Sequence, residues 1–375
     1  MTWVSSMADI ARITLSMAEQ RLDALVTLGM RNCAYLAGAI SEGPWLNEPQ
    51  GLAPWMTCLI PPDRSFTFGG RLRDSDLPVD SLGPDHTRAA RLAELANQMH
   101  QRGLARGRIG LDMDFAAVSD LQRLEELLPE ATFVAADLLL AEARACKTPQ
   151  EIQWLRKAIA ASETGYKEML LAVRVGMSFQ DLVTVWAKAV LDNGALPINT
   201  SPVSWMLPHG GTSSREQPNA AVIRSPGVVE AGLVYRVDLA AVSAGYFSDQ
   251  KFNFCVGTPR KESLAVWREH RERQLFMEDF VRPGKTKREV FDACQREFRG
   301  IDEYAWWIHG VGMDKHEEPL IGSLLPSAVD VRPEISFAEN NVVSLESSWL
   351  EEDMYVLQTD GFERLGTIPQ EVAIV

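Results

Sequence analysis

The sequence lacks any long apolar run and any excess of basic residues. No stretch of about 18 consecutive apolar residues occurs, so we expect no membrane-spanning helix. Asp and Glu number 51 against 37 Lys and Arg, and the net charge of −14 disfavours nucleic-acid binding, which needs a basic surface. The N-terminus also has no basic segment followed by an apolar core, so we expect no signal peptide and a cytoplasmic location.

Cysteine and histidine are both scarce. The cysteines are odd in number, widely spaced and without a CxxC pair, which argues against a disulfide framework and predicts reduced, structural thiols. Only six histidines occur, so the placing of His309 and His316 within eight residues of each other is a notable signal. The five cysteines are Cys33, Cys58, Cys146, Cys255 and Cys294.

The length of 375 residues and a hydrophobic content of 46% predict two globular domains. Up to residue 143, short strands within 57–68 and 108–112 alternate with helices such as 87–102, as in a small α/β domain. After it, Thr148, Pro149 and Glu151 form a capping box that opens an amphipathic helix. Further helices are expected at 178–194, at 261–280 and from 286.

Two aspartates stand in a β-rich segment over residues 234–257. A turn near residues 243–245 makes this segment a hairpin candidate. Asp238 lies in an otherwise apolar strand, where an ionised carboxylate needs a compensating cation or hydrogen-bond donors. Arg236 is one such partner. Because Asp249 follows eleven residues later across the hairpin, shared metal binding is favoured.

A glycine-flanked histidine follows in the block Trp306-Trp-Ile-His-Gly-Val-Gly312. Glycine permits unusual backbone angles and the close approach of a ligand, so His309 is the better candidate for a metal ligand. His316, seven residues later, is left to hydrogen-bond a substrate.

The last acidic block contains Glu346 and Glu352. Along one strand, six residues would separate them by about 20 Å, which is too far for ligands of one metal centre. The chain must therefore fold back over residues 347–351 into two antiparallel strands. By composition alone, Glu351 and Asp353 compete with Glu352 for the second position.

Four carboxylates and one imidazole suit two divalent cations. Oxygen donors with a single nitrogen favour Mn, Fe(II), Co or Zn, and shared carboxylates bridge ions about 3.5 Å apart. The five candidate ligands are Asp238, Asp249, His309, Glu346 and Glu352.

These blocks resemble the M24 metallopeptidase family of methionine aminopeptidase, aminopeptidase P, prolidase and creatinase, whose catalytic domain has the pita-bread fold. The matching patterns are the spaced pair Asp238 and Asp249, His309-Gly-Val-Gly312, His316-Glu-Glu-Pro319, Ser344-Leu-Glu346, and Glu352-Asp353. This register selects Glu352 over Glu351.

The resemblance continues upstream. Arg21-Leu-Asp-Ala-Leu-Val and Asn32-Cys-Ala-Tyr35-Leu-Ala-Gly38 are similar to the N-terminal domain of the prolidase, aminopeptidase P and creatinase branch. The resemblance thus implies an α/β (α+β) protein with a creatinase-type N-terminal α/β domain over residues 1–143 and a pita-bread catalytic domain over 144–375.

The resemblance also implies roles for the site residues. Asp249 and Glu352 would bridge two metal ions, most often Mn, with Fe, Co or Zn as alternatives; Asp238 would complete one coordination sphere, and His309 with Glu346 the other. Glu346 would exchange a proton, and His316 would polarise the scissile carbonyl. Relatives with this domain layout commonly form homodimers.

The sequence departs from this family in two places. Peptidases of the family carry a further histidine before the first aspartate; the nearest candidate here is His209, 29 residues before Asp238, which we predict as a further catalytic residue. Leu350 also stands where prolidases place an arginine. Tryptophans 205, 306, 307 and 349 lie near the motifs and either line a pocket or belong to the core.

Three functions are consistent with these residues. The first is an Xaa-Pro peptidase acting on short peptides. The second is a metal-dependent hydrolase or lyase of a small non-peptide molecule, as creatinase, ectoine hydrolase and dimethylsulfoniopropionate lyases are. The third, an inactive binding module, is disfavoured because all five candidate ligands are present.

Overall fold

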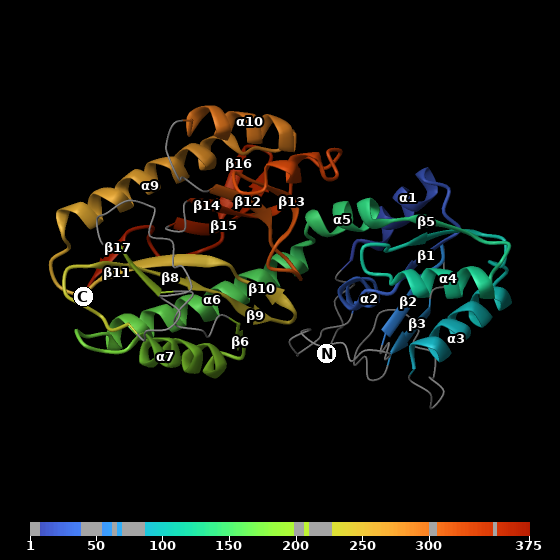
Figure 1. Cartoon of the computed structure of the whole chain (residues 1–375), viewed down its shortest axis with the longest axis horizontal. Helices are drawn as coiled ribbons and strands as arrows, with labels where there is room; N and C mark the ends of the chain where they lie inside the picture. Colours follow the sequence, from blue (N-terminus) through green and yellow to red (C-terminus); the bar gives the residue numbers. More distant parts are fainter. Residues whose placement is uncertain are drawn as a thin grey trace. The chain divides into compact units, whose positions relative to one another are not determined.

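The computed structural model describes residues 8–38, 55–61, 66–69, 87–198, 206–209, 227–299, 306–347 and 351–375. The chain divides into two compact units, Met1–Arg144 and Ala145–Val375 (Figure 1). Each unit has its own sheet.

The first unit contains a five-stranded mixed sheet in the order β3-β2-β1-β4-β5. The central strand β1 runs parallel to β4 and antiparallel to β2. Apolar side chains of this sheet and of α3 and α4 form one core. The strands are β1 Ala24–Thr27, β2 Trp55–Leu59, β3 Phe66–Gly69, β4 Arg108–Leu111 and β5 Thr132–Ala135, and the helices are α1 Ile10–Glu19, α2 Met30–Ala37, α3 Arg88–Gln101, α4 Val118–Leu127 and α5 Asp137–Ala145.

The second unit contains a larger sheet in the order β13-β12-β14-β15-β11-β8-β7, with β16 paired to β15 and β17 paired to β11. The unit also contains a separate three-stranded sheet in the order β10-β9-β6. The strands are β6 Leu196–Pro197, β7 Met206–His209, β8 Val234–Leu239, β9 Ala241–Ser243, β10 Tyr246–Phe247, β11 Gln250–Cys255, β12 Trp306–Gly310, β13 Glu317–Gly322, β14 Val342–Ser347, β15 Glu351–Gln358, β16 Gly361–Arg364 and β17 Val372–Ile374.

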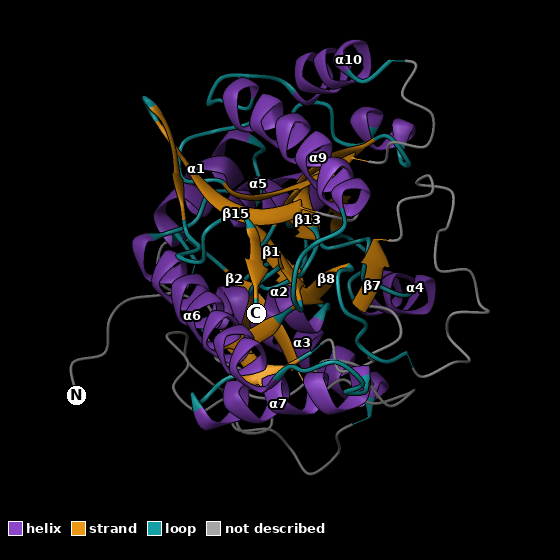
Figure 2. Ribbon diagram, turned by 90° about the vertical axis from the view of Figure 1, so that its left-hand side faces the viewer, coloured by secondary structure: helices purple, strands orange, loops and turns teal. Residues whose placement is uncertain are grey.

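Two pairs of helices cover different halves of this larger sheet (Figures 1 and 2). Helices α6 and α7 share a core with β8 and β11, and α9 and α10 share a core with β12, β14 and β15. The helices are α6 Pro149–Ala172, α7 Phe179–Asp192, α9 Lys261–Phe280 and α10 Lys287–Glu297, with a 3₁₀ turn at Pro326–Asp330.

The strands of the larger sheet alternate between helix-facing apolar residues and residues that face the other way. Val343 and Leu345 on β14, like Trp306 and Ile308 on β12, pack into the core under α9 and α10. Successive side chains point to opposite faces of a strand, so the residues between them, such as Glu346 and His309, lie on the opposite face. The acidic residues thus occupy the face that these helices do not cover.

The structure confirms the mixed α/β class and the helix starts that the sequence predicted. Helix α6 begins after the Thr148 capping box, α7 after Ser178 and α10 after Thr286. Helix α9 spans Lys261–Phe280, as expected. The side chains of Thr148, Ser178 and Thr286 each accept from a backbone N–H group that a helix leaves without an internal partner.

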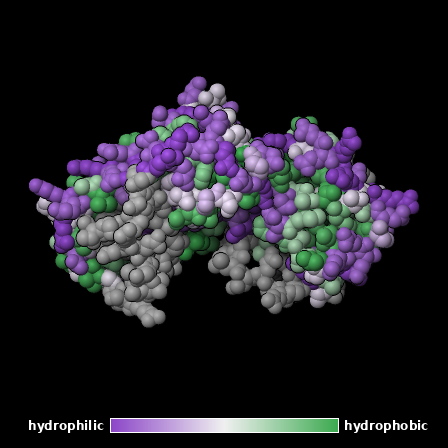
Figure 3. All heavy atoms as spheres, turned by 45° about the horizontal axis from the view of Figure 1, so that its top comes forward, coloured by the Kyte–Doolittle hydropathy of each residue, from purple (hydrophilic) through white to green (hydrophobic). Residues whose placement is uncertain are grey.

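In the described part of the chain, no helix combines the length and the apolar character that a membrane crossing requires. All five cysteines are free thiols, as predicted. Hydrophilic residues cover much of the surface that Figure 3 shows, in keeping with the acidic composition.

The capping box of α6 gives a stability prediction. Thr148 Oγ1 accepts from the Glu151 backbone N–H, and Glu151 Oε2 accepts from the Thr148 N–H at 2.7 Å. We expect Thr148→Ala to lower the free energy of unfolding by about 1 kcal/mol, because it removes one of these bonds. Chemical denaturation measures this change.

The matched control is Thr164→Ala, in the middle of the same helix. Its hydroxyl only donates to the Ala160 carbonyl, which already has a helical partner. We expect a change within about 0.5 kcal/mol for this variant. Equal losses in the two variants would contradict the capping argument.

Candidate metal centre

Adjacent strands of the larger sheet deliver the acidic residues to one place. Glu346 on β14 pairs directly with Glu352 on β15, which confirms that the chain folds back between them. Strand β15 pairs with β11, and β11 pairs with β8, where Asp238 lies opposite Lys251. Strands β12, β14, β15 and β8 therefore carry four of the candidate ligands, and Asp249 stands directly before β11, which lies between β15 and β8.

The side chains of all five candidate ligands converge. Ligand atoms lie within 4.8 Å of one another in three overlapping groups. Asp249, His309 and Glu352 each belong to two of these groups, so these three residues occupy the middle of the cluster. The groups are Asp238–Asp249–Glu352, His309–Glu346–Glu352 and Asp249–His309–His316.

His309 presents one ring nitrogen to the acidic residues. Its Nδ1 lies 3.1 Å from the carbonyl oxygen of Gly310. A carbonyl only accepts, so this nitrogen carries the proton in the neutral ring and Nε2 has a free lone pair. Nε2 lies 3.4 Å from Glu352 Oε1 and 3.9 Å from Asp249 Oδ2. Burial lowers the pKa of His309, but the nearby carboxylates, Glu352 foremost, outweigh burial and raise it.

The glycines around His309 are required by close packing. A Cβ on Gly310 would overlap the Glu318 carbonyl oxygen, and one on Gly312 would overlap the Glu317 carboxylate. Any other residue at Gly310 would meet backbone atoms of β13 and push that strand away, whereas at Gly312 the overlap is with the Glu317 side chain, which would have to move.

Two lysines lie among the carboxylates, and the sequence reasoning missed both. Lys251 Nζ lies 2.5 Å from Glu352 Oε2 and 2.7 Å from Glu346 Oε1. Lys315 Nζ lies 2.9 Å from Asp249 Oδ1 and 3.5 Å from Asp238 Oδ1. Burial lowers the pKa of each lysine, but the surrounding carboxylates outweigh burial and raise it, so both are ammonium ions at neutral pH.

A sequence signal for Lys251 did exist. It stands two residues after Asp249, and residues two apart share a face of a strand. Lys315 has a weaker signal, its position next to His316.

His316 lies at the solvent side of the cluster. Its side chain is 41% exposed, and Nε2 lies 3.7 Å from Asp249 Oδ2. The ring makes edge contacts with His309 and Trp307. Burial, together with the positive charges of His309 and Lys315, lowers the pKa of His316, so the ring is neutral at neutral pH.

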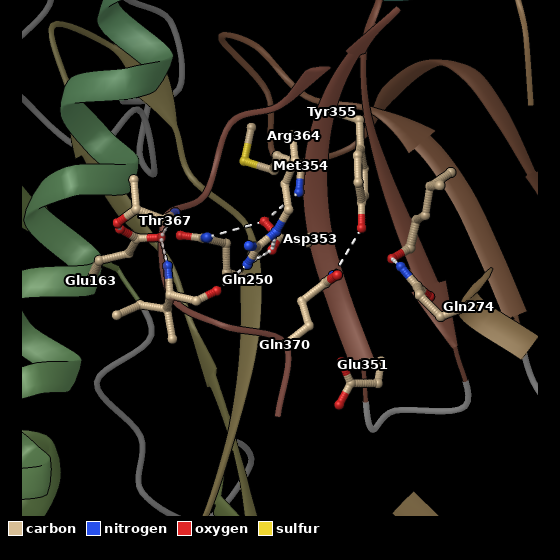
Figure 4. A network of polar contacts seen from close by, with 12 residues as sticks. Glu163, Gln250, Gln274, Glu351, Asp353, Met354, Tyr355, Arg364, Thr367 and Gln370 are labelled. Atoms are coloured by element: carbon tan, nitrogen blue, oxygen red, sulfur yellow. Dashed lines mark hydrogen bonds and ion pairs between the residues drawn. The ribbon is translucent and has the colours of Figure 1, made fainter. Parts of the chain in front are cut away.

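The neighbours of Glu352 in sequence face the other side of β15. Glu351 accepts from Trp267 of α9 and from Asn253. Asp353 accepts from Gln250 and forms an ion pair with Arg364, as Figure 4 shows. The alternation along β15 thus separates Glu352 from both competing carboxylates.

The remaining sequence candidates have different positions. His209 lies on β7, where it pairs with Val234, and its side chain is outside the described residues. Trp306 packs between Phe291 and Phe298 in the core, so the interpretation of this residue as pocket-lining is wrong. Trp307 is on the opposite face, beside His316. Trp205, Trp349 and Leu350 lie outside the described residues.

The donor atoms fit a divalent cation. Asp249 Oδ2 and His309 Nε2 are buried and have no hydrogen-bond partner among the described residues. Such atoms carry a desolvation cost that a bound cation would remove. Glu352 Oε1 lies beside them and accepts from Ser344 Oγ at 2.8 Å, which fixes its orientation.

Comparison with known proteins places this site in a family. Residues 153–365 match metallopeptidase family M24, and residues 10–146 match the creatinase/prolidase N-terminal domain. The chain belongs to metallopeptidase family M24. The predicted membership is confirmed, and the protein is an enzyme, a hydrolase of the M24 type.

Similar proteins match this chain over different shares of its length. An uncharacterized hydrolase/peptidase of Sinorhizobium fredii is 22% identical over 97% of this chain and 95% of its own length. An Xaa-Pro dipeptidase of Lactobacillus helveticus is 27% identical over 56% of this chain and 57% of its own. The X-Pro aminopeptidase structure from Thermotoga maritima superposes with a TM-score of 0.74 at 20% identity, covering 97% of this chain and 99% of that one. This likeness confirms the predicted fold, a pita-bread domain preceded by a creatinase-type domain.

The two faces of β15 give a paired prediction. We expect Glu352→Gln to weaken Mn²⁺ binding by more than about 100-fold. Loss of a residue that only supports a metal ligand costs up to about 100-fold in affinity, and loss of a ligand itself should cost more. Glu351→Gln removes a similar carboxylate from the other face and should leave Mn²⁺ binding unchanged. Titration calorimetry on the metal-free protein compares Mn²⁺ binding by the two variants. An equal loss of affinity in both would contradict the assignment of Glu352, and not Glu351, to the metal centre.

Proposed function

We propose that this protein is a metal-dependent peptidase that hydrolyses the C–N bond of short Xaa-Pro peptides. The observation that carries the proposal is the convergence of Asp249, His309 and Glu352 on buried donor atoms without hydrogen-bond partners, in a chain of the M24 family. The names of the Xaa-Pro dipeptidase and X-Pro aminopeptidase relatives support the substrate class.

In this proposal, Asp249, His309 and Glu352 hold the cation, and Asp238 and Glu346 are further candidate ligands, as the sequence predicted. When bound, the cation supplies Lewis-acid activation of water and of the scissile carbonyl. Glu346, through the oxygen that does not contact Lys251, accepts a proton from the attacking water. Burial raises the pKa of Glu346, in spite of Lys251, and this direction suits a group that takes up and returns a proton.

His316 has a separate role in the proposal. It lies at the exposed side of the cluster, so it can reach a bound substrate. A neutral imidazole there donates a hydrogen bond to the oxyanion that forms as the carbonyl is attacked. His209 is proposed as a second substrate-contacting histidine, on the basis of its place on β7.

We further propose manganese as the metal, a homodimer as the assembly and the cytoplasm as the location. The carboxylate-rich donor set supports manganese, and the resemblance to the prolidase branch supports the dimer. Metal analysis, sedimentation at micromolar concentration and cell fractionation test these three points.

A substrate screen tests the function. We expect Mn²⁺-loaded protein to release the first residue from Xaa-Pro dipeptides or longer Xaa-Pro peptides and not from matched Xaa-Ala peptides. Product detection by mass spectrometry, with Asp249→Asn as the inactive control, gives the readout. Cleavage of small amides or betaines without any cleavage of proline peptides would instead establish the second function, action on a small non-peptide molecule.

The role of His316 gives a kinetic prediction. We expect His316→Ala to lower kcat by about 100-fold or more, the scale for loss of one oxyanion donor. The Mn²⁺ content should not change, because the three proposed ligands remain. His100→Ala, at an exposed histidine of α3, is the matched control. A loss of metal that accompanies the loss of rate would assign His316 to the metal instead.

A further inference from the structure

The carboxylates of the candidate metal centre already have positively charged partners. Lys251 Nζ lies 2.5 Å from Glu352 Oε2, 2.7 Å from Glu346 Oε1 and 3.5 Å from Asp238 Oδ2. Its side chain is only 2% exposed. Three carboxylates thus surround this ammonium group, two of them within hydrogen-bonding distance and Asp238 as a longer ion pair.

The backbone dictates this position of Lys251. The residue lies on β11 directly opposite Asp238 on β8 and opposite Glu352 on β15. Side chains at paired positions of neighbouring strands lie close together on the same face. The ammonium group is therefore placed between the two strands that carry these carboxylates.

The charge of the cluster leaves room for one divalent cation. Its four carboxylates carry four negative charges, and the ammonium groups of Lys251 and Lys315 neutralise two of them. One divalent ion then brings the group to neutrality. A second ion would leave two uncompensated positive charges among these groups, and the buried guanidinium of Arg236 adds one more positive charge whether one ion or two are bound.

We propose that Lys251 takes the place of one of the two metal ions, so that the centre holds a single divalent cation. The proposal rests on the metal dependence proposed above, and it differs from the two-ion centre that the sequence led us to expect. Three side chains bind the cation, namely Asp249, His309 and Glu352. Asp238 and Glu346 bind the lysines instead of a metal.

The ligand atoms that have no hydrogen-bond partner indicate which of the two metal positions holds the single ion. Asp249 Oδ2 and His309 Nε2 have no hydrogen-bond partner among the described residues, while the nearest oxygen of Glu346 contacts Lys251. Glu352 contributes to both sides, with Oε2 on Lys251 and Oε1 beside His309. A three-ligand site of this kind leaves coordination positions open for water and substrate.

The number of ions per chain tests the proposal. The full-length protein is stripped with a chelator, loaded with excess Mn²⁺, freed of unbound metal and analysed by mass spectrometry for manganese. We expect one ion per chain and the electron paramagnetic resonance signal of an isolated Mn²⁺. Two ions per chain with spin coupling, or no bound ion, would overturn the proposal.

Removing the lysine should restore the second position. We expect Lys251→Met to bind two Mn²⁺ per chain, with a spin-coupled signal in place of the isolated one. Lys287→Met is the matched control, since Lys287 is also buried but pairs with Glu318, outside the cluster, and it should keep one ion. A folded Lys251→Met protein, checked by circular dichroism, that still binds only one ion would contradict the substitution of a metal by Lys251.

Two aspartate variants keep the test decisive if Lys251→Met does not fold. Asp249→Asn should lose the single ion, and Asp238→Asn should keep it. In a two-ion centre both variants would lose metal. The number of bound ions does not depend on the substrate. One ion per chain without peptidase activity would contradict only the proposed function. Two ions per chain with Xaa-Pro cleavage would contradict only the single-ion proposal.

Discussion

The second unit of this protein depends on the neutralisation of four buried carboxylates on one face of a sheet. An ionised carboxylate removed from water is costly unless a positive charge or donors lie beside it. The described residues supply two ammonium groups for this purpose, and the free lone pairs of Asp249 and His309 call for one further cation. The acidic cluster, its lysines and its metal therefore form one electrostatic unit.

The two faces of these strands have different roles, one holding the acidic cluster and the other packing against the helices. On β15, Glu352 faces the cluster while Glu351 and Asp353 face α9 and the strand network around Arg364. The face toward the helices fixes the strands through apolar packing and through these buried polar contacts. Because the strands are fixed, the register that brings Glu346 opposite Glu352 is fixed as well, and the ligands need no rearrangement to meet.

Much of this arrangement could be predicted from the sequence because it follows from local rules. The capping box at Thr148, the hairpin that holds Asp238 and the return of the chain between Glu346 and Glu352 each need only spacing and strand geometry. The resemblance to a family then selected Glu352 from three acidic neighbours. Lys251 was missed because a family pattern directs attention to expected ligands, and the choice between pocket and core for Trp306 stayed open because composition does not tell which face of a strand a residue occupies.

The geometry of Lys251 also bears on where substrate specificity arises. Its ammonium group is buried and surrounded by three carboxylates, so the group serves to hold Glu346 and Glu352 in place. Among the described residues of the cluster, His316 is the most exposed, and its ring lies against Trp307. A substrate that approaches from this side meets these two side chains. Differences in this entrance, more than in the buried carboxylates, would distinguish a peptide substrate from a small non-peptide one, since the buried carboxylates would be the same for either reaction.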